Sequence, residues 1–268
     1  MNTISNILKQ KHDSRNCALI PFITAGYPDI NVTLEVLYRL DDKGADIIEL
    51  GIPYADALAD GPIIQESSKV ALKQEVYIDD ILKILEKSAS SLKAPIIIFT
   101  YYNPILVRGI SKFIFEIYLK GAKGLIIPDL PLEEIDYLLS LCNLYDVELI
   151  LFVAMTSSKN RISKILSKSS NCIYLVSRTG VTGMRNFIDP NISNLSNYIK
   201  SQKNKFIMVG FGISNCLQAS FISKWNIDGI VVGSAFINIL STYSINHNYL
   251  EQLGCFCKDL KMAITKSD

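Results

Sequence analysis

The chain has 268 residues, 49% of them hydrophobic, which is enough for one large apolar core. Its 27 Lys and Arg residues nearly balance its 26 Asp and Glu residues, and a net charge of +1 excludes the basic surface that nucleic-acid binding requires. Residues 1–12 carry charges where a secretory signal would be apolar, and no apolar run is long enough to cross a bilayer. We therefore expect an intracellular protein with a small neutral or anionic ligand.

Eight short apolar, β-branched runs predict strands, and amphipathic segments between them predict helices. The expected strands are Cys17–Thr24, Asp46–Gly51, Pro95–Tyr101, Gly124–Asp129, Glu148–Val153, Cys172–Ser177, Lys205–Phe211 and Asp228–Gly233. The expected helices include Val32–Lys43, Ile78–Ser88, Ile110–Lys120, Leu132–Cys142, Lys159–Lys168 and Asn215–Lys224. Continuous apolar strands that alternate with helices indicate a parallel sheet covered on both faces, and eight such units indicate a closed (β/α)8 barrel. An open doubly wound sheet, the alternative, would need a more polar edge strand than any of these.

No Pro-, Gly- or Ser-rich linker divides the chain, so we expect residues 1–268 to form a single α/β domain. This domain is expected to be a (β/α)8 TIM barrel with an extra N-terminal helix and inserted active-site loops. The interval between the second and third expected strands is longer than the others, and Tyr54–Gln65 within it is rich in Ala, Asp, Gly and Pro. We interpret it as an inserted active-site loop.

Glu49 is the most informative residue, because it lies within a buried apolar strand with no Lys, Arg or His beside it. A lone buried carboxyl is costly, and its pKa is pushed up toward an acid/base role. Asp60 follows in the loop, where helix capping and catalysis are about equally compatible with its place before Gly61. Asp129, between two prolines, is expected to fix a turn, and Asp56 is expected to hold its loop or contact a partner.

Glycines follow the last three expected strands, at the end where the active site of such a barrel lies. They fall in Ser177–Gly183, Gly210–Ser214 and Gly233–Phe236. Backbone N–H groups freed by these glycines, together with a short helix expected to begin at Ser234, can hold a phosphate without a lysine. Three tight turns without a ligand are the alternative.

The sequence lacks the residues that Schiff-base chemistry and metal-dependent chemistry would require. No Lys ends a strand, so a Schiff-base mechanism lacks its nucleophile, and neither His12 nor His247 is at a strand end. The six cysteines form neither a disulfide framework nor a zinc motif, so we expect no metal. Proton transfer by carboxyl groups remains. Aromatic residues near the strand ends, core residues by default, would line an apolar pocket: Phe22, Phe99, Tyr101, Tyr174 and Phe211.

Five segments together resemble the tryptophan synthase alpha chain family, over the length from the first strand to the last. They are Phe22–Asp29, Glu49–Pro53, Leu58–Gln65, Ser177–Gly183 and Gly210–Ile213. The resemblance implies a carbon-carbon lyase that cleaves indole-3-glycerol phosphate to indole and glyceraldehyde 3-phosphate. It also implies an alpha2-beta2 tetramer in which indole passes to a beta chain, and pyridoxal phosphate is expected only on that partner.

The resemblance assigns roles to residues of this sequence. Glu49 and Asp60 would be the catalytic pair, with Glu49 as acid and base and Asp60 accepting the indole N–H. Phe22, Phe99, Tyr101, Tyr174, Thr182 and Phe211 would bind the substrate, and Gly183, Gly212, Gly233 and Ser234 its phosphate. Where the family usually has Ser-Asp-Pro, this chain has Ala55-Asp56-Ala57, which is expected to loosen the loop and its coupling to the partner.

Two other functions stay open at this point. One is another barrel enzyme that acts on a phosphorylated sugar, such as an epimerase or the synthase of indole-3-glycerol phosphate, although the latter would be expected to carry a strand-end lysine. The other is a barrel subunit that activates a beta chain without turnover of its own. A composition rich in Ile, Lys, Asn and Ser indicates an AT-rich genome, which is typical of some bacteria and of plastids. The compartment is therefore expected to be the cytoplasm or a plastid stroma.

Overall fold

A computed structural model describes residues 2–176, 191–210, 212–244 and 247–265. Eight parallel strands form a closed barrel in which each strand pairs with the next and β8 pairs with β1. The strands are β1 (Ala18–Thr24), β2 (Ile48–Gly51), β3 (Ile96–Phe99), β4 (Gly124–Ile126), β5 (Glu148–Ala154), β6 (Cys172–Val176), β7 (Phe206–Gly210) and β8 (Gly229–Val232). The expected (β/α)8 barrel is confirmed.

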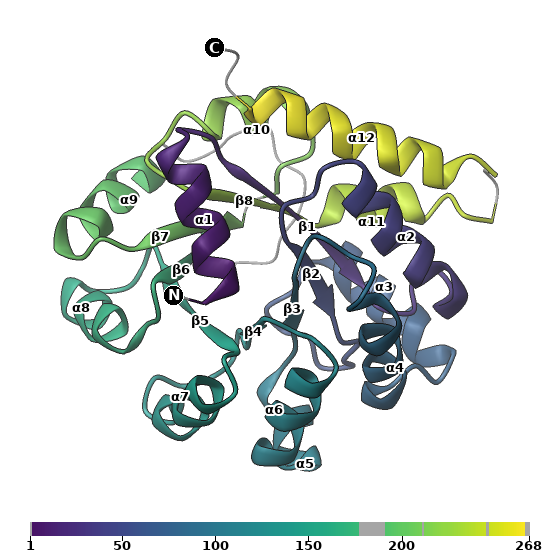
Figure 1. Ribbon diagram of the computed structural model, residues 1–268, viewed down its shortest axis with the longest axis horizontal. Coiled ribbons are helices and arrows are strands. Elements are labelled where there is room, and N and C mark those ends of the chain that lie inside the picture. Colours follow the sequence, from purple (N-terminus) through teal and green to yellow (C-terminus); the bar gives the residue numbers. More distant parts are fainter. Residues whose placement is uncertain (1, 177–190, 211, 245–246, 266–268) are drawn as a thin grey trace.

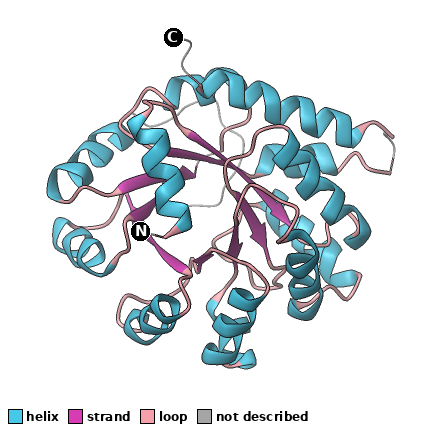
Figure 2. Ribbon diagram, in the orientation of Figure 1, coloured by secondary structure: helices cyan, strands magenta, loops and turns pink. Residues whose placement is uncertain are grey.

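Helices surround the strands on all sides (Figures 1 and 2). The described helices are α1 (Thr3–Asp13), α2 (Ile30–Asp42), α3 (Pro62–Lys73), α4 (Ile78–Ser88), α5 (Tyr102–Arg108), α6 (Ile110–Leu119), α7 (Ile135–Leu144), α8 (Lys159–Lys168), α9 (Asn191–Gln202), α10 (Cys216–Ile222), α11 (Ser234–Leu240) and α12 (Tyr249–Ile264). The expected N-terminal helix is α1, which lies across the barrel in Figure 1.

Local sequence signals set several of these boundaries. Asp29 caps α2 by accepting the N–H of Asn31 at 2.8 Å, and Ser158 and Asn215 cap α8 and α10 in the same way. Pro62 occupies the first turn of α3, where its missing N–H costs nothing. The expected helices at 78–88 and 159–168 agree residue for residue with α4 and α8.

Two expectations need correction. The strands β3 and β4 end at Phe99 and Ile126, so Tyr101 and Asp129 lie in the loops after them rather than in strands. The long interval after β2 is only partly a loop, because it also contains the additional helix α3. Sequence reasoning does not predict α3, because its first turn, at Pro62–Gln65, falls within the Ala-, Asp-, Gly- and Pro-rich stretch that is typical of a loop.

Two layers of apolar side chains form the core. Inside the barrel, alternate residues of the strands pack together, among them Ile20 and Phe22 of β1, Ile97 of β3 and Met208 of β7. Between barrel and helices, the opposite faces of the strands pack on the helices. Because the strands are covered on both sides, they read as continuous apolar runs, and any polar residue inside them stands out.

Helix α1 closes the barrel end at which the strands begin, and three acidic residues hold it there. Ser5 donates its N–H and its hydroxyl to Glu148, the first residue of β5. At the other end of the helix, Lys11 pairs with Asp46 at 2.7 Å and His12 contacts Asp228 at 2.8 Å. The carboxyl groups at this end, of which those of Glu148 and Asp228 are buried, therefore have structural partners.

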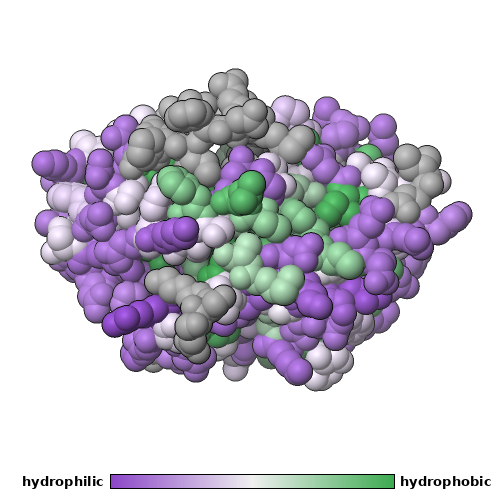
Figure 3. Space-filling model, turned by 90° about the horizontal axis from the view of Figure 1, so that it is seen from above, coloured by the Kyte–Doolittle hydropathy of each residue, from purple (hydrophilic) through white to green (hydrophobic). Residues whose placement is uncertain are grey.

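The outer surface of the helix layer also has an exposed apolar area. Seen from above, an apolar area extends over the helices α10 and α12, which lie at the top of Figure 1 (Figure 3). These two helices carry the exposed side chains of Leu217, Phe221 and Met262. None of the described helices has the length and apolar character needed to cross a membrane.

Candidate active site

Glu49 lies in the middle of β2 and faces the barrel interior beside Phe22 of β1 and Ile97 of β3. It is 1% exposed, and its Oε1 atom has no hydrogen-bond partner among the described residues. Burial, followed by the negative charge of Asp60, raises the pKa of Glu49 from an ordinary 4.5 to about 8. A proton on this carboxyl is therefore favoured at neutral pH.

Asp60 lies in the loop between β2 and α3 and is 8% exposed. The hydroxyl of Tyr101 donates a hydrogen bond to its Oδ2 atom at 3.0 Å. Burial raises the pKa of Asp60 to about 6, while the Tyr101 hydrogen bond acts in the opposite direction. Asp60 is not a helix cap, because Gly61 occupies the N-cap position of α3.

The two carboxyl groups thus differ in protonation. Between pH 6 and pH 8 Glu49 is mostly protonated and Asp60 mostly ionised, which gives one acid and one anion in the same buried site. No described Lys, Arg or His forms an ion pair with either of them. This division of roles suits proton transfer to one atom of a substrate and stabilisation of positive charge at another.

Aromatic side chains from neighbouring strands form a wall beside the carboxyl groups. The rings of Phe22 and Phe99 meet edge to face at 5.5 Å, and Phe99 meets Tyr101 at 6.4 Å. The ring of Phe22 occupies space that a side chain on Gly51 would fill, since a Cβ there would lie 2.7 Å from the Phe22 Cζ atom. The structure thus brings together the three predicted aromatic residues of β1 and the β3 end, which can contact a flat apolar group.

Tyr174 of β6 lies on the other side of the same space. It is 9% exposed, and its ring packs on Phe152 of β5 at 4.8 Å. Burial and the nearby charges of Glu49 and Asp60 raise the pKa of the Tyr174 phenol, which places it near both carboxyl groups. Its hydroxyl also requires a glycine at 210, because a Cβ there would lie 2.1 Å from it.

Sequence reasoning missed two residues of this site. Phe152 follows the inward alternation of β5 and pairs in register with Tyr174, so the two-residue period of this strand is the sequence signal for it. Gln65 of α3 donates from its Nε2 atom to the carbonyl oxygens of Ala57 and Asp60, at 3.1 Å in each case. It thereby braces the loop that carries the second carboxyl.

The predicted phosphate-binding residues of the last two strands lie next to each other. Strands β7 and β8 are paired, with Gly210 opposite Val231, so the loops holding Gly212 and Gly233 are neighbours. Gly233 is the N-cap of α11, which begins at Ser234 as expected. The first N–H groups of a helix lack partners within it and can bind an anion. The remaining predicted residues, Thr182, Gly183 and Phe211, lie outside the described residues.

Asp129 and Asp56 occupy the positions expected of structural or surface residues. The Oδ1 atom of Asp129 accepts the N–H of Tyr102 at 2.8 Å and so joins the loops after β3 and β4. Asp56 is exposed in the loop after β2, next to Leu58, which is 87% exposed.

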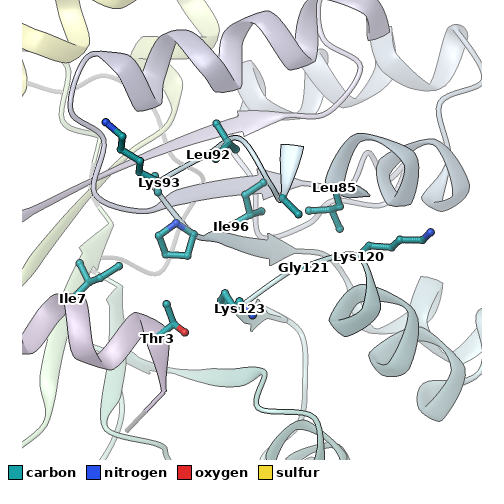
Figure 4. Close-up of a pocket in the computed structure, with 12 residues that line it drawn as sticks. Thr3, Ile7, Leu85, Leu92, Lys93, Ile96, Lys120, Gly121 and Lys123 are labelled. Atoms are coloured by element: carbon teal, nitrogen blue, oxygen red, sulfur yellow. The ribbon is translucent and has the colours of Figure 1, made fainter. Parts of the chain in front are cut away.

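A cavity of about 190 Å³ lies away from this site, near the beginnings of β3 and β4, and is lined from both α1 and α4. Thr3, Ile7, Leu85 and Ile96 are among the residues that line it, and the side chains of Lys93 and Lys120 extend away from each other at its rim (Figure 4). None of the residues that line it is Asp, Glu or His, so it offers no carboxyl pair of the kind that Glu49 and Asp60 form. Among the described residues no three His, Cys, Asp or Glu side chains are grouped as metal ligands would be.

Comparison with known proteins gives one consistent match. The model of the tryptophan synthase alpha chain family matches residues 8–265. The tryptophan synthase alpha chain of the red alga Gracilaria tenuistipitata var. liui is 62% identical over 264 residues, covering 98% of this chain and 97% of the relative. That of the cyanobacterium Acaryochloris marina is 45% identical, with 98% of each chain covered.

A solved structure of tryptophan synthase from Mycobacterium tuberculosis has a TM-score of 0.90 at 28% identity and covers 99% of both chains. The Glu-Leu-Gly-Ile-Pro and Asp-Gly-Pro motifs, which suggested the resemblance, are those that carry the two buried carboxyl groups of the site. The chain therefore belongs to the tryptophan synthase alpha chain family, and the protein is a lyase of tryptophan biosynthesis.

Proposed function

We propose that this chain cleaves indole-3-glycerol phosphate to indole and glyceraldehyde 3-phosphate by a retro-aldol reaction, with Glu49 and Asp60 as its catalytic residues. The observation that carries the proposal is the pair of buried carboxyl groups, one favouring its proton and one ionised at neutral pH. The aromatic wall of Phe22, Phe99 and Tyr101 supports an indole ring beside them.

The net change in the reaction is the transfer of one proton from a glycerol hydroxyl to an indole ring carbon, by way of Glu49. Glu49 gives its proton to the indole ring carbon that bears the glycerol chain, and the ring becomes positively charged. The resulting carboxylate then takes the proton of the hydroxyl next to the bond, the carbon–carbon bond breaks, and its electron pair restores the neutral indole. Asp60 accepts the indole N–H and stabilises the positive charge while it exists. Glu49 ends protonated again, so the step consumes no other reactant.

The substrate phosphate is proposed to bind at Gly212, Gly233 and Ser234, on the loops after β7 and β8. Their glycines allow close approach of the backbone, and an anion there is favoured by the start of α11. The proposed reaction requires no cofactor on this chain. Pyridoxal phosphate is assigned to the beta partner, which uses the released indole.

Replacing Glu49 with Gln tests the proposal, because Gln keeps the shape and removes the proton. We expect the rate of indole release from indole-3-glycerol phosphate to fall by about 10²- to 10⁴-fold or more. The matched control is Glu148→Gln, which changes an equally buried carboxyl at the opposite end of the barrel and is expected to retain more than half of the activity. Unchanged indole release by Glu49→Gln contradicts the proposal.

We further propose that a beta chain docks at the barrel end that holds the site, in an alpha2-beta2 assembly. Leu58 is 87% exposed in the loop after β2, and Val107 of α5 is 81% exposed after β3. The two segments are neighbours, since Asn103 of α5 donates to the hydroxyl of Tyr54 at 3.4 Å. Exposed apolar residues on two neighbouring segments at this end of the barrel favour a partner there.

Leu58→Lys is expected to weaken the complex with the beta chain at least 10-fold, because it places a charge in an apolar contact. Leu217→Lys is the control, since Leu217 is 85% exposed on α10, on the outer helix layer. Titration calorimetry of each variant with the beta chain gives the two affinities. Equal affinities for the two variants contradict this docking surface.

The proposed compartment is the plastid stroma of an alga or the cytoplasm of a bacterium. Support comes from the relatives, of which those of red algae are 62%, 60% and 52% identical and those of cyanobacteria about 45%. Cell fractionation with an antibody against the chain tests it, and recovery in a membrane fraction contradicts it.

A further inference from the structure

Tyr101 makes contacts that a plain pocket wall does not require. It lies two residues after the end of β3 and is 3% exposed. Its hydroxyl donates to Oδ2 of Asp60 at 3.0 Å and accepts the N–H of Ala59 at 3.1 Å. One phenol therefore uses both its donor and an acceptor on two consecutive residues of the loop that carries the second carboxyl.

The ring of Tyr101 is fixed from several sides. It lies against Tyr54, at the beginning of the same loop, with ring centres 5.2 Å apart and planes 31° apart, and it meets the edge of Phe99. The backbone on either side is held as well, because the N–H of Thr100 donates to Ile126 at 3.0 Å and that of Tyr102 to Asp129 at 2.8 Å. The position of the Tyr101 hydroxyl is therefore set by contacts with the ends of β3 and β4, and this hydroxyl donates to the carboxyl of Asp60 on the loop after β2.

We propose that Tyr101 is a positioning residue that holds the Asp60 carboxyl in its reactive orientation and keeps it ionised. Only the catalytic consequence of this inference rests on the proposed function, because the contact itself involves no substrate. The hydroxyl would stabilise the anion by a charge-assisted hydrogen bond, which favours the ionised form. Gln65 holds the backbone of Asp60 from the α3 side, so backbone and side chain have separate supports.

The titratable groups that face Asp60 come from three elements. Glu49 of β2 and Tyr174 of β6 both sense its charge, and Tyr101 after β3 bonds to it directly. Burial raises the pKa of Asp60, and Tyr101 is the group that lowers it. Removing the hydroxyl removes the lowering effect and leaves the burial in place.

Tyr101→Phe keeps the ring and removes the hydroxyl, and Tyr102→Phe is the matched control. Tyr102 is the next residue, and the carboxyl that raises the pKa of its phenol is that of Glu134, not that of Asp60. The Asp60 carboxyl is followed by ¹³C NMR in the free protein during a pH titration. We expect its midpoint to rise by about 1 pH unit in Tyr101→Phe and to stay unchanged in Tyr102→Phe. An unchanged midpoint in Tyr101→Phe overturns the inference.

Kinetics provide the second readout. The acidic limb of the kcat/KM profile for indole release is expected to move to higher pH by the same amount in Tyr101→Phe. At pH 7 kcat is expected to fall about 3- to 10-fold, the value of one hydrogen bond, while KM changes less than 2-fold. A rise in KM with kcat unchanged overturns the inference and makes Tyr101 a wall of the binding pocket.

The two readouts separate this inference from the proposed function. A wild-type chain that fails to cleave indole-3-glycerol phosphate, alone and with a beta chain, contradicts the proposed function, and the NMR titration still decides whether Tyr101 acts on Asp60. A wild-type chain that is active, with a Tyr101→Phe variant whose titration and kcat are unchanged, contradicts the positioning role alone. Circular dichroism of both variants verifies that the barrel is folded.

Discussion

Glu49 owes its properties to its place inside the barrel rather than to any neighbour in sequence. A carboxyl at 1% exposure with an unpartnered oxygen is unfavourable when ionised, and Asp60 adds a second negative charge nearby. Folding therefore stabilises the protonated form of Glu49. Asp60, with a hydrogen bond from Tyr101, remains the more acidic of the two.

This difference predicts a pH-dependent stability. The pKa of Glu49 is about 8 in the folded protein against an ordinary 4.5, so between these values the folded state binds more protons than the unfolded state. The free energy of unfolding contributed by Glu49 therefore falls as pH rises from 4.5 to 8. The Glu49→Gln variant has no such ionisation. We therefore expect its free energy of unfolding, relative to that of wild type, to be about 2–4 kcal/mol higher at pH 8 than at pH 5.

Urea unfolding at both pH values measures the change. The cost of burying the amide of Gln is the same at pH 5 and pH 8, so the difference between the two values isolates the charge of Glu49. A relative stability that is equal at the two pH values would mean that Glu49 is ionised without penalty.

At the scale of elements, the contacts that hold α1 are distinct from those of the site. Asn2, at the start of this helix, makes no side-chain cap, and Glu148 of β5 instead accepts both donors of Ser5. A strand residue thus caps a helix that lies 143 positions away in sequence. The acidic groups at the two barrel ends therefore serve different purposes, one structural and one proposed to be chemical.

Glu148→Ala is expected to lower the free energy of unfolding by about 1–3 kcal/mol, because it leaves the buried donors of Ser5 without an acceptor. Glu86→Ala is the control, since Glu86 is 62% exposed, forms a surface pair with Lys120, and should change stability by less than about 1 kcal/mol. Denaturant unfolding of both variants at pH 7 tests this. Equal effects of the two substitutions would exclude a capping role for Glu148.

The sequence predicted the elements well where a local signal exists. The strands are apolar on both faces, and helices such as α4 have apolar residues at a regular helical spacing, so their places follow from periodicity. Helix α3 gives a weaker signal, because its buried positions include Ser67 and Ser68 and because it directly follows the Ala-, Asp- and Gly-rich loop. The hydrogen bond between Tyr101 and Asp60 was not predicted either, because it joins residues of two loops whose approach depends on barrel closure.

At the scale of the whole molecule, the barrel separates stability from the proposed chemistry. Helix α1 and its acidic partners are at the end where the strands begin, and Glu49, Asp60 and the aromatic wall are toward the other end. The Ala55–Ala57 segment, where the chain departs from the usual family sequence, lies beside this second end. Asp56 is exposed there, whereas Ala57 is buried and accepts a hydrogen bond from Gln65. The predicted loosening of this loop stays a prediction.

The pH dependence of kcat/KM for indole release from indole-3-glycerol phosphate tests the central claim most directly. The reactive form has Glu49 protonated and Asp60 ionised, and the pKa values of about 8 and about 6 therefore predict a bell-shaped profile with its maximum near pH 7. The value of kcat/KM is expected to fall tenfold per pH unit below the pKa of Asp60 and tenfold per pH unit above the pKa of Glu49. A rate that keeps rising from pH 7 through pH 9 would contradict the account, because it would require Glu49 to act from its ionised form.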